Sequence, residues 1–337
     1  MKTLNTMLAI PIIASASVAD TAGLQIEELF LPHHEARARV AIWYPSTALE
    51  NRILYADNAV FKGVEAYLEG SVSDGEHPVV LFSHGLGGTD RSQAWLGAAL
   101  AKKGAIVVLV NHPNSTWSDF DMSDGVKHWT RITDLRAALD ALLENPKFSG
   151  HVDTTRIMAA GFSYGGWTAL SMGGATGNHA GSVETCQRFR QSMSVCDLLL
   201  SNEVSLQTID PDVWNKRYAD PRITHVTAID PGFVWGLDES NLTFLIPQTL
   251  VIGLGGANDR LPAADFDRSG LSDLMGGRRI ERFNPAYHFT AMPVCKPSGA
   301  AILVAENDDP VCTDPAGTDR AAVHSAIIEL MSGELGL

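Results

Sequence analysis

Positive charge is scarce in this chain of 337 residues, which has 25 Lys and Arg against 39 Asp and Glu, a formal net charge of −14. Nucleic acids and anionic membranes both repel an acidic surface, so we expect neither as a partner. Beyond the amino terminus, no run approaches the roughly 18 apolar residues that a membrane span needs. Hydrophobic residues nevertheless make up 45% of the chain, which is typical of a soluble globular protein with a large core.

Residues 1–19 differ from the rest of the chain. Lys2 is followed by an apolar stretch that starts at Met7 and ends in Ser17–Ala19. Ser17 and Ala19 are small residues at the two positions that signal peptidase recognises for cleavage before Asp20. We therefore expect a signal peptide over residues 1–19 and a mature protein in the periplasm or outside the cell. A buried amino-terminal strand or helix is the alternative.

Cysteine is also rare, with four residues in two neighbouring pairs, Cys186 with Cys196 and Cys295 with Cys312. None of them forms a C-x-x-C motif or a zinc spacing. An even number in an exported protein suggests two local disulfides, although four cysteines allow three pairings. Four buried free thiols in a cytoplasmic enzyme are the alternative.

The middle of the chain alternates between short apolar runs and helical patterns. The expected strands are 40–44, 79–83, 106–110, 156–162, 225–230, 248–253 and 280–283, and the expected helices are 92–102, 132–142, 164–172 and one that starts near residue 318. This alternation predicts a mainly parallel sheet with helices on both faces. No linker or repeat interrupts it, which favours a single domain over residues 20–337.

Two stretches depart from this rhythm. Residues 51–76 are polar and rich in turn residues, so we expect irregular structure there. Residues 175–222 are polar, contain the first cysteine pair and have no buried strand, which indicates a helical insertion after the helix at 164–172. The insertion is either a lid over an active site or a surface excursion. Five aromatic residues in or near these loops are candidates for an apolar pocket or for the core: Trp117, Phe120, Trp214, Phe233 and Trp235.

The most informative motif is Gly161–Phe162–Ser163–Tyr164–Gly165, in the pattern G-x-S-x-G. It lies between an expected strand and an expected helix, the order found in the nucleophile elbow of serine hydrolases. The turn is so tight that a Cβ at Gly161 or Gly165 is expected to collide with a neighbouring strand or helix. A passive serine in a glycine-rich turn is the alternative.

A serine nucleophile needs a base, usually histidine, and an acid that orients the histidine. His288 follows the last expected strand and is the predicted base. Asp230 and Asp259 both follow earlier strands, at the edge where open α/β sheets place their sites. Either carboxylate fits the chain order nucleophile, acid, histidine.

A developing oxyanion needs two backbone N–H donors. Tyr164, the residue after the predicted nucleophile, supplies one of them. The glycine-rich turn His84–Gly88 follows the strand at 79–83, and Leu86 in this turn is the predicted second donor. A simple tight turn is the alternative.

Several segments together resemble a bacterial group labelled predicted dienelactone hydrolases, which is similar to platelet-activating-factor acetylhydrolases. These segments are Ile42–Pro45, Leu81–Gly87, Asn111–Pro113, Gly161–Gly166 and Cys312–Pro315. The resemblance spans about residues 36–330 and implies the α/β-hydrolase fold. It also implies Asp230 as the acid and Leu86 as an oxyanion donor. True dienelactone hydrolases use a cysteine nucleophile, whereas this chain has Ser163.

The resemblance and the motifs predict a serine carboxylesterase or lipase-like hydrolase that acts on a small-molecule ester through an acyl-enzyme. An amidase or peptidase with the same triad, and a catalytically idle binding scaffold, are the alternatives. The mechanism needs no metal or cofactor, and His33–His34–Glu35 does not match the zinc motif H-E-x-x-H. The oligomeric state is left open.

Overall fold

A computed structural model describes residues 21–190, 194–256 and 260–337. The expected signal peptide, residues 1–19, lies outside these ranges. In chain order the strands are β1 (Thr21–Leu31), β2 (Ala36–Ser46), β3 (Arg52–Tyr55), β4 (Val64–Leu68), β5 (His77–Ser83), β6 (Ile106–Val110), β7 (Ser115–Thr116), β8 (Asp119–Phe120), β9 (Val152–Phe162), β10 (His225–Ile229), β11 (Thr249–Leu254) and β12 (Arg279–Phe283). The α-helices are α1 (Ala94–Lys102), α2 (Met122–Gly125), α3 (His128–Glu144), α4 (Tyr164–Met172), α5 (His179–Arg188), α6 (Ser194–Ser201), α7 (Pro211–Trp214), α8 (Glu239–Leu242), α9 (Leu271–Leu274), α10 (Gly299–Glu306) and α11 (Arg320–Leu335). Short 3-10 helices are η2 (Leu206–Thr208), η3 (Pro262–Ala264) and η4 (His288–Ala291).

One ten-stranded sheet runs through the molecule in the order β12-β11-β10-β9-β5-β6-β2-β1-β4-β3. All neighbours from β12 to β6 are parallel, which confirms the mainly parallel sheet. The strand β2 is antiparallel to both β6 and β1. Because parallel strands end at the same edge, the loops after β5, β9, β10 and β12 meet there.

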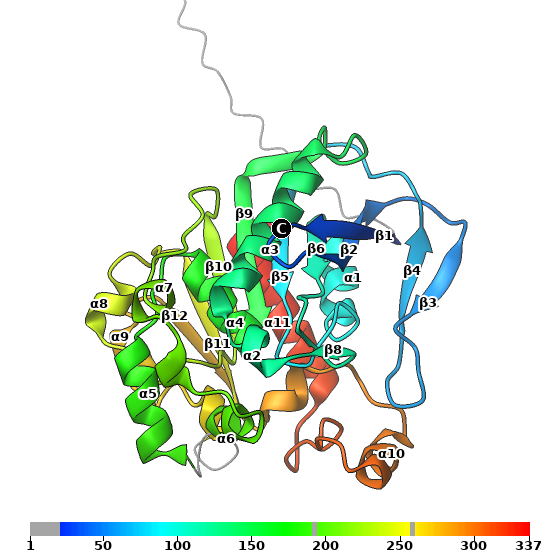
Figure 1. The fold of residues 1–337 in the computed structure, drawn as a ribbon. Helices are drawn as coiled ribbons and strands as arrows, with labels where there is room; N and C mark the ends of the chain where they lie inside the picture. Colours follow the sequence, from blue (N-terminus) through cyan, green and yellow to red (C-terminus); the bar gives the residue numbers. More distant parts are fainter. Residues whose placement is uncertain (1–20, 191–193, 257–259) are drawn as a thin grey trace, which may run out of the picture.

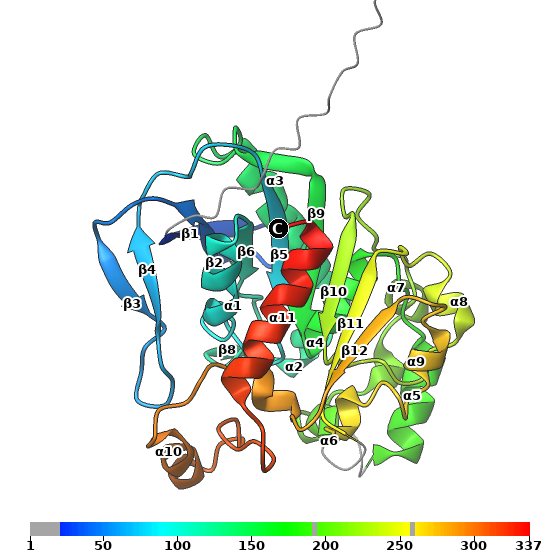
Figure 2. The same ribbon diagram turned by 180° about the vertical axis from the view of Figure 1, so that it is seen from behind.

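Helices cover both faces of this sheet, as expected. The helices α3 and α4 lie on the face seen in Figure 1, and α1 and α11 lie on the opposite face, seen in Figure 2. Side chains of a strand alternate between the faces. In β5, Val79 and Leu81 belong to the core under α3 and α4, whereas Val80 and Phe82 belong to the core under α1 and α11. This two-sided burial explains the continuous apolar run in the sequence.

The amino-terminal end of the sheet differs from the prediction. Residues 51–76 contain β3 and β4 instead of irregular structure, and β1 was not predicted. Charged residues interrupt the apolar pattern of β3 and β4 in the sequence. In the structure two of them, Arg52 of β3 and Glu65 of β4, form an exposed ion pair between the two strands. A strand at the end of a sheet buries less of its surface than a central one, so its apolar pattern is weaker.

Other boundaries differ by a few residues. The strand predicted at 40–44 is part of the longer β2. Pro45 pairs with β1 but not with β6, so β2 continues past Pro45 to Ser46 along β1 alone. The helix α10, between the second pair of cysteines, was not predicted. Within the residues that the structure describes, none of the helices combines the length and apolarity needed to cross a membrane.

Two helical glycines provide a test of how tightly α1 packs on the sheet. A Cβ at Gly97 in α1 would lie 2.6 Å from the Trp43 ring, whereas a Cβ at Gly333 in α11 has no such neighbour within 4 Å. We expect Gly97→Ala to destabilise the protein by about 1–3 kcal/mol through overpacking. Gly333→Ala, the matched control, should stabilise it by up to about 1 kcal/mol through helix propensity. Urea unfolding measures both, and equal effects of the two substitutions would contradict the predicted packing.

Candidate active site

Ser163 lies at a sharp turn between β9 and α4. Its backbone has φ 56° and ψ −120°, a strained conformation for a residue with a side chain. The predicted close approach of the flanking glycines is confirmed: a Cβ at Gly161 would overlap the carbonyl oxygen of Gly165, and one at Gly165 would overlap that of Ser83. The turn therefore holds the Ser163 hydroxyl at the carboxyl edge of the sheet, where the residue is half-buried.

Two other predicted residues meet Ser163 at this edge. His288 begins η4 after β12, and its Nε2 lies 3.0 Å from Ser163 Oγ. Its Nδ1 lies 2.6 Å from Asp230 Oδ2. When Nδ1–H donates to the carboxylate, Nε2 is an acceptor for the serine hydroxyl. His288 and Asp230 are both buried, so water does not compete for their hydrogen bond.

Hydrogen bonds to two residues of β11 fix both the side chain and the backbone of Asp230. Its second oxygen, Oδ1, accepts a hydrogen bond from the Leu254 N–H at 2.9 Å, and its own N–H donates to the Ile252 carbonyl at 2.6 Å. Its φ of 43° turns the chain directly after β10. Among the described residues, Asp230 is the carboxylate that is hydrogen-bonded to His288. Asp259, the other predicted acid, lies outside the described residues.

The predicted oxyanion donors flank Ser163. Tyr164 is the first residue of α4, so its N–H has no carbonyl partner within the helix. On the other side, a Cβ at Gly85 would lie 3.3 Å from the Ser163 Cβ, which places the turn with Leu86 directly against the serine. The Gly87 N–H donates to the Ser115 carbonyl at 2.9 Å and holds the turn in place.

Arg131, a residue that the sequence analysis did not single out, lies behind both donors. Its Nη1 donates to the His84 carbonyl at 2.6 Å, and its Nη2 donates to Ser115 Oγ at 2.9 Å. The guanidinium also lies 4.2 Å from the centre of the Tyr164 ring. Burial lowers the pKa of Arg131 to about 10, so the side chain still carries its charge at neutral pH. It joins the glycine-rich turn to the first residue of α4.

A buried hydrogen-bonded chain links Arg131 to a counter-charge. Arg131 Nη1 donates to Ser83 Oγ at 3.2 Å, Ser83 Oγ lies 2.9 Å from His112 Nε2, and His112 Nδ1 lies 2.8 Å from Asp134 Oδ2. Burial and then the charge of Arg131 lower the pKa of His112 to about 4, so it is neutral at pH 7. Burial raises the pKa of Asp134, but hydrogen bonds from His112 and from His33 and His34 outweigh it and hold this pKa well below its usual range. Asp134 therefore carries the compensating negative charge.

Ser83, His112 and Asp134 repeat the order of side chains seen in Ser163, His288 and Asp230. All three are sealed from solvent, with exposed fractions of 0%. No substrate reaches Ser83, so this second cluster has a structural role. The signals in the sequence were the segments Leu81–Gly87 and Asn111–Pro113, which enter the resemblance with no role assigned to Ser83 or His112.

The helical insertion at 175–222 packs beside this edge of the sheet, near α2 (Figure 1). Trp214 is buried in a cluster that also includes Met122 of α2 and contacts Leu86 and Phe233. The Phe233 ring stacks on Tyr164 at 4.5 Å. The other three aromatic candidates differ: Trp235 is half-buried, whereas Trp117 and Phe120 are exposed at 76% and 38%. An apolar wall thus lies next to the predicted oxyanion donors.

The four cysteines form two disulfides, Cys186–Cys196 and Cys295–Cys312. The second bond closes the segment that contains α10. This segment is joined to the loop between β3 and β4 by backbone hydrogen bonds from Lys62 N–H to Val294 O and from Lys296 N–H to Val60 O.

With this geometry described, the chain can be compared with known proteins. Residues 18–124 match the profile of a family described as platelet-activating factor acetylhydrolase, isoform II. No curated protein matches the sequence. A ferulic acid esterase from Streptomyces cinnamoneus superposes with a TM-score of 0.59 and 18% identity, over 96% of this chain and 91% of that one. A dienelactone hydrolase-like promiscuous phosphotriesterase from metagenomic libraries superposes with a TM-score of 0.51 and 16% identity, over 92% of this chain and 98% of that one.

The sheet order, the helices on both faces and these two structures show that the chain has the α/β-hydrolase fold. Over residues 18–124 the sequence is similar to the platelet-activating factor acetylhydrolase family, isoform II. This match is shorter than the span of 36–330 that the motifs implied, and it does not include Ser163, Asp230 or His288. The structural likeness, at such low identity, shows the fold alone.

The loop that carries His288 rests on a second buried histidine. His324 Nε2–H donates to the Thr290 carbonyl at 2.8 Å, and its ring stacks on Trp95 at 3.7 Å. Burial is the main reason that the pKa of His324 falls from 6.5 to about 4. The hydrogen bond to the Thr290 carbonyl opposes this fall, Arg320 lowers the pKa further, and Asp314 raises it. The unfolded chain therefore binds a proton between these two pH values that the folded protein does not bind.

We expect the free energy of unfolding to decrease as the pH falls from about 6.5 to about 4, and His324 to add about 1.4 kcal/mol per pH unit to this slope. Above that range the group is neutral in both states and adds no pH dependence. In His324→Gln, which keeps an N–H donor for Thr290, the slope should be smaller by this amount. Urea unfolding across the range measures it, and an unchanged slope would contradict the burial of a neutral His324.

Proposed function

We propose that this chain is a serine carboxylesterase in which Ser163 is the nucleophile, His288 the general base and Asp230 the residue that orients it. The observation that carries the proposal is the distance of 3.0 Å from His288 Nε2 to Ser163 Oγ while Asp230 holds Nδ1. The relation to acetylhydrolases, which are ester hydrolases, supports the same class of reaction.

In the first half of the reaction, Ser163 Oγ attacks the ester carbonyl carbon as His288 Nε2 accepts the hydroxyl proton. Negative charge develops on the carbonyl oxygen, where the N–H groups of Leu86 and Tyr164 stabilise it. His288 then gives the proton to the alkoxide, so that an alcohol leaves and the acyl group remains on Ser163. The carboxylate of Asp230 stabilises the transient imidazolium.

In the second half, water takes the place of the alcohol. His288 accepts a proton from the water, which attacks the acyl carbonyl carbon, and the same N–H groups hold the oxyanion. Collapse of this intermediate releases a carboxylic acid and restores the Ser163 hydroxyl. Phe233 and Leu86 form an apolar surface beside the donors, which favours the acyl chain of a small or medium ester over a charged substrate.

We also propose that the enzyme is exported, by cleavage of a signal peptide over residues 1–19. The disulfides Cys186–Cys196 and Cys295–Cys312 support this location, because such bonds persist in the periplasm or outside the cell and are rare in the cytosol.

Hydrolysis of p-nitrophenyl acetate, butyrate and octanoate tests the proposed activity. We expect turnover by the wild type and a loss of at least about 10⁴-fold in Ser163→Ala, because no other group supplies the attacking oxygen. Ser149→Ala is the matched control and should keep full activity, because this exposed serine precedes β9 and lies at the opposite end of that strand from Ser163. A fluorophosphonate probe should label the wild type at Ser163. A folded wild type that neither turns over these esters nor reacts with the probe would support a binding scaffold, and probe labelling with cleavage of amides alone would support an amidase.

The choice of Asp230 as the acid is tested separately. Asp230→Asn should lower kcat by about 10⁴-fold. The amide oxygen would stay with the Leu254 N–H, so the amide NH2 would face His288 Nδ1, donate to it and favour the wrong tautomer. Asp259→Asn should change kcat by less than about tenfold. Denaturant unfolding verifies that both variants are folded. A larger loss in Asp259→Asn than in Asp230→Asn would reject the proposed triad.

A further inference from the structure

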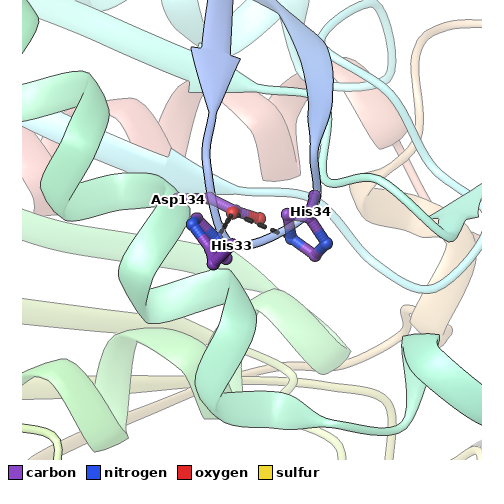
Figure 3. A group of neighbouring side chains, drawn as sticks. All are labelled: His33, His34 and Asp134. Atoms are coloured by element: carbon purple, nitrogen blue, oxygen red, sulfur yellow. Dashed lines mark hydrogen bonds and ion pairs between the residues drawn. The ribbon is translucent and has the colours of Figure 1, made fainter.

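The turn between β1 and β2 brings two histidines to one buried carboxylate. His33 Nε2 lies 2.6 Å and His34 Nε2 lies 3.1 Å from the same oxygen, Asp134 Oδ1 (Figure 3). The side chains of His33 and His34 are 25% and 6% exposed, and that of Asp134 is 0% exposed. The three donor atoms all lie within 4.8 Å of one another.

The carboxylate is oriented from behind, as metal-ligating carboxylates are. Asp134 Oδ2 accepts a hydrogen bond from His112 Nδ1 at 2.8 Å, and this fixes Oδ1 toward the turn. The two lone pairs of Oδ1 let both imidazoles donate to it in the absence of an ion. Two Nε2 atoms and one carboxylate oxygen that converge in this way are also the arrangement of donor atoms around a bound metal ion.

We propose that His33, His34 and Asp134 bind one divalent transition-metal ion, for which Zn²⁺ is the best match. Two imidazoles and one carboxylate suit zinc, whereas Ca²⁺ and Mg²⁺ prefer oxygen donors alone. The exposed side of His33 leaves a fourth position for water. The site differs from the zinc motif considered in the sequence, because its carboxylate comes from α3 and not from Glu35.

Only a small adjustment of the turn admits the ion. Tetrahedral zinc with bonds of about 2.0–2.1 Å separates its ligand atoms by about 3.3 Å. Both Nε2 atoms therefore move away from Oδ1, His33 by more than His34. The turn permits this, since backbone hydrogen bonds hold it only at His34 N–H and Glu35 N–H, and His33 is at the surface. The imidazoles bind through Nε2 and keep their proton on Nδ1.

The ion would be structural, because it lies outside the Ser163 cluster. Through Asp134 it joins the β1–β2 turn to α3, and through His112 and Ser83 it connects to the buried Arg131. Binding should therefore stabilise the folded protein without becoming part of the reaction.

Equilibrium dialysis of chelator-treated mature protein, prepared without a polyhistidine tag, tests the site. We expect one Zn²⁺ per chain, competition by Co²⁺ with the visible absorption of four-coordinate cobalt, and no competition by Mg²⁺ or Ca²⁺. His33→Ala and His34→Ala should each weaken zinc binding by at least about 100-fold. His151→Ala, which removes a histidine from a different loop, is the matched control and should bind as the wild type does. Both test residues lie in a surface turn, so their substitution avoids the loss of stability expected when the buried Asp134 is replaced.

Zinc should also raise the Tm of the wild type and of His151→Ala, but not that of His33→Ala. Retention of tight zinc binding in both turn variants, or its loss in His288→Ala instead, would assign the ion to another site and overturn the proposal. Absence of stoichiometric binding in the wild type would overturn it as well. None of these measurements depends on ester hydrolysis.

Discussion

The buried guanidinium of Arg131 is the constraint on which the arrangement around Ser163 depends. A charge without access to water is costly unless it is paired and hydrogen-bonded, and Arg131 meets this requirement through Ser83, His112 and Asp134. The chain of contacts fixes the carboxyl ends of β5 and β6 relative to α3. The same guanidinium donates a hydrogen bond to the His84 carbonyl in the turn that contains Leu86. The contacts that compensate the charge of Arg131 therefore also hold this turn next to Ser163.

The parallel part of the sheet brings Ser163, Asp230 and His288 close together. Ser163, Asp230 and His288 are far apart in sequence, but each follows a parallel strand whose carboxyl end lies at one edge. The strain at Ser163 and the left-handed backbone at Asp230 direct both side chains along that edge. A rigid, two-sided core under this edge keeps the hydrogen-bonded geometry without a bound substrate.

The sequence was most informative where the determinants are local. The strand at 79–83, the helix Tyr164–Met172 and the glycine pattern around Ser163 follow from neighbouring residues, and the order of strands then directed attention to His288 and to two carboxylates. Arg131 and Asp134 were missed because polar residues inside an amphipathic helix look like exposed ones until their partners, about 20 to 100 residues away, are known. Strand order alone left both Asp230 and Asp259 open as the acid, and the preference for Asp230 came from the family resemblance. The outer strands β3 and β4 escaped because charged residues interrupt their apolar pattern.

The disulfide between Cys295 and Cys312 has a consequence for the integrity of the chain. It closes a loop that contains the exposed helix α10, while the same loop is hydrogen-bonded to the turn before β4. A protease that cuts once between these cysteines leaves both fragments covalently joined. The segment with His288 then stays attached to α11 across the cut. Such a nicked molecule keeps Ser163, Asp230 and His288 in one covalently joined protein.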